Sequence, residues 1–153
     1  MGQNGKATTE KTTFGRTTSV STNIKADPAI VWKLLTSASD YTRWNSTVVS
    51  IAGEIIAGGS IKLVSKLAPK RTFSLKVKEF VPEKMLVWGD MQGARIYEIN
   101  RVGDGTVSFS MKEKIGGIMF PFYAKYIPSF DQSFEQFAAD LKKEAEAIQN
   151  LKK

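Results

Sequence analysis

Six short runs of alternating apolar and polar residues fill the middle of the chain, between Thr47 and Ile115. Alternation with a period of two predicts half-buried β-strands, and turns rich in glycine or proline separate the runs. The predicted strands cover residues 47–56, 60–68, 71–81, 84–91, 94–101 and 106–115. The links between them are too short for crossover helices, so neighbouring strands must be antiparallel.

A strand and a short helix are predicted before this block. Residues 20–26 alternate in the same way and indicate a seventh strand. Asp27 can cap a helix and Pro28 suits its first position, so we expect a short helix over residues 29–38.

Tyr41 and Trp44 stand three positions apart in an otherwise polar stretch. If Ser39 or Asp40 caps a second short helical turn over residues 40–45, the two rings share one face. We expect that face to pack inward as core and close one end of the fold. A direct place in a ligand cavity is the alternative.

A long amphipathic helix is predicted at the C-terminal end, over residues 129–150, with Pro128 at its start or at a kink before it. Apolar residues recur there at spacings of three and four: Phe130, Phe134, Phe137, Leu141, Ala145 and Ile148. The order of elements predicts an α+β fold in which seven strongly twisted strands curl around one long helix.

The chain of 153 residues fits one domain, which we expect over residues 17–153, after a flexible arm over residues 1–16 that is rich in threonine, glycine and lysine. The longest apolar stretch, residues 115–124, is about half of the roughly 20 residues that a membrane span needs. The first residues contain no apolar block of the kind found in secretory signals. We therefore expect a cytoplasmic protein.

The chain has neither cysteine nor histidine. This excludes disulfides, thiolate nucleophiles, histidine-based proton transfer and metal sites built on sulfur or imidazole. Chemistry would have to come from carboxylates, lysine, arginine or tyrosine, and we expect no cofactor and no metal. Alternation places many lysines on the outer face of the sheet, which accounts for much of the formal net charge of +7. No motif or aromatic interleaving points to nucleic acid.

Four stretches and the terminal helix carry a resemblance to a known family: IKADPAIVWKLLTSASDYTRWNSTV, GGSIKLV, FSLKVKEFVPEKMLVWG and YEINRVGDGTVSFSMKEKIGG. Over residues 18–150 the chain resembles the START-like helix-grip superfamily, also called SRPBCC, and within it the polyketide cyclase/dehydrase and lipid-transport branch. The resemblance implies a cavity between the sheet and the C-terminal helix. It also implies a hydrophobic ligand such as a lipid, quinone or polyketide, and only some members are enzymes.

Side-chain alternation indicates which residues face this cavity. The candidate ligand-binding residues are Phe73, Leu75, Trp88, Tyr97, Phe109 and Met111 from the strands and Phe122, Tyr126 and Phe130 from the segment leading into the helix. Ordinary core packing is the alternative for each of them.

The same alternation places three charged residues on the inward face. If Trp88 pairs with Tyr97, Asp90 lies opposite Arg95, and a glycine turn then places Glu113 on the other side of Arg95. Asp90, Arg95, Tyr97 and Glu113 are therefore the candidate catalytic residues. A solvated row of ion pairs at the cavity rim is the alternative.

Three functions fit these features. The leading one is binding or transfer of a small hydrophobic ligand without catalysis. The second is a cyclase or dehydratase in which carboxylate, arginine and tyrosine side chains move protons. A protein-interaction module is the third. Residues 115–130 would form a gate or lid at the cavity mouth, and weak contact with an anionic membrane surface is left open.

Overall fold

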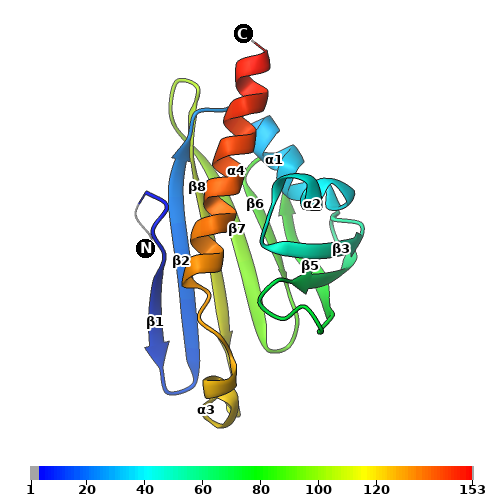
Figure 1. Ribbon diagram of the computed structural model, residues 1–153, viewed down its shortest axis with the longest axis vertical. Helices are drawn as coiled ribbons and strands as arrows, with labels where there is room; N and C mark the ends of the chain where they lie inside the picture. The colour runs from blue at the N-terminus through cyan, green and yellow to red at the C-terminus, as the bar shows by residue number, and fades with distance from the viewer. Residues whose placement is uncertain (1–3, 153) are drawn as a thin grey trace.

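A curved antiparallel sheet wraps around one long helix (Figure 1). The computed structural model describes residues 4–152. The order across the sheet is β1-β2-β8-β7-β6-β5-β4-β3. The strands are β1 (Thr8–Thr12), β2 (Gly15–Ile24), β3 (Val48–Gly53), β4 (Ser60–Ser65), β5 (Phe73–Val81), β6 (Met85–Gly89), β7 (Gly93–Gly103) and β8 (Thr106–Gly116). The predicted helix-grip fold is confirmed, with eight strands in place of seven.

The additional strand lies in the segment predicted to be a flexible arm. β1 pairs with β2 in antiparallel register, from Thr8 opposite Ser19 to Thr12 opposite Gly15. The prediction of an arm is wrong for these residues, and residues 1–3 lie outside the described part. β1 has no apolar alternation because it is an edge strand with mostly exposed side chains. That one domain covers residues 17–153 stays a prediction.

Three short helical elements link β2 to β3: α1 (Pro28–Thr36), η1 (Ala38–Asp40) and α2 (Tyr41–Trp44). The predicted cap of α1 is confirmed, since Asp27 Oδ1 accepts a hydrogen bond from the Ala29 N–H at 2.8 Å. Asp40 occupies the cap position of α2 but makes no capping bond. Its carboxylate instead pairs with Arg43, with Nε 2.7 Å from Oδ1, because a guanidinium is a stronger partner than a backbone amide.

Residues after β8 form α3 (Phe120–Tyr123), η2 (Ala124–Tyr126) and the long helix α4 (Asp131–Leu151). The break that contains Pro128 separates α4 from the preceding turns, as predicted. No helix within residues 4–152 is long and apolar enough to cross a membrane.

The core lies between α4 and the concave face of the sheet. Phe137 is its centre, with ring centroids 5.9 Å from Trp44, 5.7 Å from Tyr97 and 6.4 Å from Phe109. Tyr41, 1% exposed, completes the cluster at 6.3 Å. The prediction that Tyr41 and Trp44 pack inward together is confirmed. These rings fill the space beneath this part of α4, and the pocket described below lies beyond the start of the helix.

Candidate functional site

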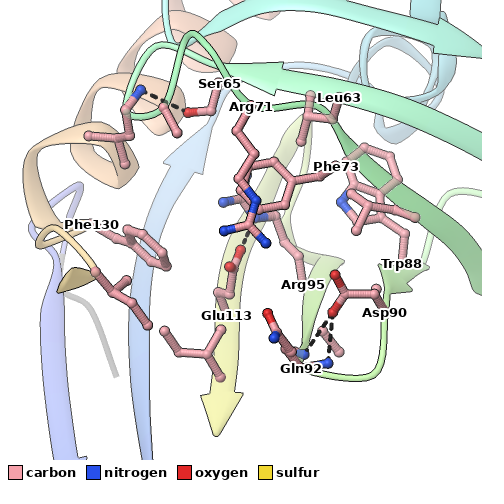
Figure 2. A pocket seen from close by; sticks show the side chains of 18 of the residues that line it. Leu63, Ser65, Arg71, Phe73, Trp88, Asp90, Gln92, Arg95, Glu113 and Phe130 are labelled. Carbon is pink, nitrogen blue, oxygen red and sulfur yellow. Dashed lines mark hydrogen bonds and ion pairs between the residues drawn. The ribbon is translucent and has the colours of Figure 1, made fainter. Parts of the chain in front are cut away.

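A pocket of about 240 Å³ lies at the end of the sheet where α4 has not yet begun (Figure 2). Its walls are the inner face of β4 to β8, the loop between β4 and β5, and residues 126–130 before α4. Five of the predicted ligand-binding residues line it: Phe73, Leu75, Trp88, Tyr126 and Phe130. The pocket is therefore mostly apolar and aromatic, with a few polar groups, as small-molecule sites commonly are.

The other four predicted ligand-binding residues do not line this pocket. Tyr97, Phe109 and Met111 are at most 1% exposed and pack in the core that Phe137 covers. Phe122 is 73% exposed on α3, away from the pocket walls. The sheet alternation was interpreted correctly for the three core residues, but α4 covers their part of the concave face.

The predicted charged row is present in part. Arg95 lies opposite Glu113, as expected, and Tyr97 lies opposite Met111. The predicted pairing of β6 with β7 is wrong, because Trp88 pairs with Arg95 and not with Tyr97. The turn between β6 and β7 is centred one residue earlier than predicted, so each residue of β6 pairs with a residue of β7 two positions from the predicted one. A shift by two positions keeps every side chain on the predicted face of the sheet.

Asp90 consequently has a different partner from the one predicted. It lies at the start of the turn, where Oδ1 accepts hydrogen bonds from the N–H groups of Gln92 at 2.8 Å and Gly93 at 3.1 Å. Short polar side chains commonly stabilise turns in this way. Asp90 still lines the pocket, but one carboxylate oxygen is already engaged by the backbone.

Arg95 and Glu113 form a close ion pair in the pocket wall. Arg95 Nε lies 2.6 Å from Glu113 Oε1, each side chain is 19% exposed, and the guanidinium lies 5.0 Å from the centroid of the Phe134 ring. Burial alone would lower the pKa of Arg95, but the Glu113 carboxylate outweighs it and raises this pKa above its ordinary value. The Arg95 guanidinium therefore keeps its charge at neutral pH, and the ion pair forms part of the pocket wall.

Tyr97, the fourth catalytic candidate, is not in the pocket wall. It is 1% exposed, and burial raises the pKa of its hydroxyl to about 12. Such a hydroxyl keeps its proton at neutral pH and does not line the pocket. The structure brings Asp90, Arg95 and Glu113 to the pocket and leaves Tyr97 out.

Two arginines at the pocket were missed in the sequence. Arg16 is 9% exposed and donates to the carbonyl oxygens of Pro128 at 2.7 Å and Ile127 at 3.4 Å, so it holds the wall before α4 in place. Arg71 lines the pocket from the loop after β4. The alternation of inward-facing residues could have identified both. Extended toward the N-terminus in steps of two residues, it reaches Arg16 in β2 and Arg71 just before β5.

The comparisons with known proteins agree with this architecture. A family model described as polyketide cyclase / dehydrase and lipid transport matches residues 16–146. No curated protein sequence matches the chain.

Solved structures show the same fold at low sequence identity. A conserved protein of unknown function from Enterococcus faecalis has a TM-score of 0.68 at 15% identity, covering 93% of this chain and 78% of its own. A START superfamily protein from Mycobacterium smegmatis has a TM-score of 0.64 at 13% identity, covering 86% of this chain and 98% of its own. DynU16, a putative protein in the dynemicin biosynthetic locus, has a TM-score of 0.62 at 14% identity, covering 86% of this chain and 47% of its own.

Proposed function

Because the chain belongs to the polyketide cyclase/dehydrase and lipid transport family, we propose that it binds a small hydrophobic ligand in the pocket beside residues 126–130. The observation that carries the proposal is an open pocket of about 240 Å³ whose floor and walls include Trp88, Phe73 and Phe130. Apolar walls with few polar groups favour burial of an apolar body, which is the main source of binding energy for such ligands.

Binding of a neutral fluorescent probe tests the proposal. N-phenylnaphthylamine, which becomes bright in apolar surroundings, should bind saturably at one site. Leu75→Trp should weaken this binding by about tenfold or more, because the indole occupies pocket volume and a lost contact of about 1.4 kcal/mol already costs that factor. Fluorescence titration measures both affinities.

Val102→Trp is the matched control, because it adds the same indole at an exposed position outside the pocket walls. This variant should bind the probe like the unmodified protein. Equal affinity for the Leu75→Trp variant, or no saturable binding at all, would contradict the proposal.

Ligand binding is favoured over the cyclase or dehydratase alternative by the state of the candidate residues. Proton transfer needs a group with a free lone pair or proton within reach of the ligand. Glu113 is held by Arg95 through Oε1 and Asp90 holds the turn through Oδ1, so each carboxylate already has a structural role and could offer a ligand only its second oxygen. The interaction-module alternative predicted a hollow filled by inward rings, whereas this end of the hollow is open.

An exposed apolar surface next to the pocket mouth supports weak contact with a membrane. This surface, called the apolar end below, consists of Phe14, Met91, Ile118, Met119, Phe122 and Tyr126, which are 56% to 102% exposed. Backbone hydrogen bonds hold its three segments together, from Gly117 N to Phe14 O at 2.9 Å and from Gly116 N to Gln92 O at 3.0 Å.

The apolar end suits a lipid surface because its exposed apolar side chains lie next to a positively charged residue. Lys125 is exposed, with Nζ 5.2 Å from the Tyr126 ring centroid, and the chain carries a net charge of +7. Exposed aromatic and basic residues together favour an anionic interface. A cytoplasmic location, which faces an anionic leaflet, is part of this proposal.

Changing Ile118 and Phe122 together to serine should weaken binding to vesicles that contain phosphatidylglycerol by about tenfold. The variant loses the favourable transfer of two apolar side chains from water into the lipid surface. Vesicle sedimentation measures the bound fraction. Val102→Ser with Leu151→Ser removes two exposed apolar residues outside the apolar end and should have no effect. The same loss in both double variants would show that contact is not made through the apolar end.

A further inference from the structure

Arg71 is a cation at the pocket mouth. It lies in the loop between β4 and β5, lines the pocket, and is exposed. Its guanidinium carbon lies 4.5 Å from the centroid of the Phe73 ring, and Figure 2 shows the side chain directed toward the pocket. In the part of the chain that the structure describes, no carboxylate forms an ion pair with it.

The other charged groups of the pocket wall already have polar partners. Arg95 and Glu113 neutralise each other at 2.6 Å. The Asp90 carboxylate accepts hydrogen bonds from the N–H groups of Gln92 and Gly93. Arg71 is therefore the one cation among the lining residues without an acidic partner.

Stacking on Phe73 prepares Arg71 to bind an anion. A guanidinium that lies over a ring keeps the N–H donors at its edge free, and these donors match the two oxygens of a carboxylate, sulfonate or phosphate. A neutral ligand seated beside Arg71 would remove water from an unpaired charge, which is unfavourable. An acidic ligand would replace that water with an ion pair.

We propose that the pocket binds amphipathic anions, with an apolar body against Trp88, Phe73 and Phe130 and one acidic group held by Arg71 at the mouth. This inference rests on the proposed function and specifies its ligand class. The volume limits the body, because about 240 Å³ is equivalent to on the order of eight water molecules of the liquid. A body of two or three rings, or a short chain, would occupy the pocket and its open mouth and leave its acidic group beside Arg71.

Two probes with the same rings separate charge from apolar binding. Anilinonaphthalene sulfonate carries one sulfonate, whereas N-phenylnaphthylamine has the same aromatic frame without it. Arg71→Gln should lower the affinity for the sulfonate probe by about tenfold, as loss of a hydrogen bond to a charged group does. It should change the affinity for the neutral probe by less than about threefold. Fluorescence titration gives the four affinities.

Lys70→Gln is the matched control, since it removes the same charge from the neighbouring exposed residue, which does not line the pocket. It should leave both affinities within about twofold. Sulfonate binding that Arg71→Gln leaves unchanged, or that Lys70→Gln weakens equally, would overturn the anion assignment while neutral-probe binding still supports the proposed function. Absence of saturable neutral-probe binding in the unmodified protein would overturn both.

Discussion

Replacing Phe137 with alanine is expected to lower the free energy of unfolding by about 3–5 kcal/mol, the range typical of buried phenylalanines. Phe137 is 2% exposed and contacts the rings of Trp44, Tyr97 and Phe109. Its removal leaves a cavity that these rigid rings cannot close, and it also removes the aromatic contacts themselves. Urea denaturation followed by circular dichroism measures the change.

Phe122→Ala is the matched control for this prediction. The same atoms are removed, but Phe122 is 73% exposed, so the free energy of unfolding should change by less than about 0.5 kcal/mol. A loss below about 1 kcal/mol for Phe137→Ala would show that the rings rearrange to fill the gap. The ligand pocket would then not be bounded by a rigid core.

The fold could be predicted from the sequence because its elements are marked by local patterns. Alternation identified β2 to β8, and the helical period identified α4 to within two residues at its start. β1 could not be identified in this way. Its side chains are mostly exposed, so the strand shows no apolar alternation, and pairing with β2 depends on backbone hydrogen bonds that every residue except proline can make.

The candidate site was predicted less completely because its position depends on packing between distant segments. Alternation shows which face of a strand a residue occupies, and it did so correctly for Arg95, Tyr97 and Glu113. It does not show where α4 covers that face. The helix starts at Asp131, so Phe137 lies against Tyr97, whereas Arg95 lies beside Phe134 and lines the pocket. Apolar core and ligand pocket therefore share one pattern in the sequence.

Tyr97→Phe is expected to reduce the loss of stability between about pH 10 and pH 12. The unfolded chain releases the tyrosine proton near the ordinary pKa of 10.0, whereas burial raises the pKa of Tyr97 in the folded protein to about 12. Below pH 10 both states hold the proton and the contribution is complete. Between these values the folded state binds more protons than the unfolded state, so stability falls as pH rises.

The size of this effect follows from the shift. A difference of about two pKa units corresponds to about 2–3 kcal/mol in the free energy of unfolding. The unmodified protein should lose this amount as the pH rises from about 10 to about 12, and the phenylalanine variant should not. At neutral pH the variant should be about as stable as the unmodified protein, because the Tyr97 hydroxyl makes no hydrogen bond of good geometry within residues 4–152, although the Arg95 guanidinium lies near it. Urea denaturation at several pH values measures both quantities.

Tyr126→Phe is the control, because it removes the same hydroxyl from a side chain that is 75% exposed in the folded protein. Its stability should follow the unmodified protein across the whole pH range. If the stability of the Tyr97→Phe variant showed the same pH dependence as that of the unmodified protein, the Tyr97 hydroxyl would ionise as freely in the folded protein as in the unfolded chain. Water would then reach Tyr97 beneath α4, the pocket would extend to it, and proton transfer by Tyr97 would again be a candidate mechanism.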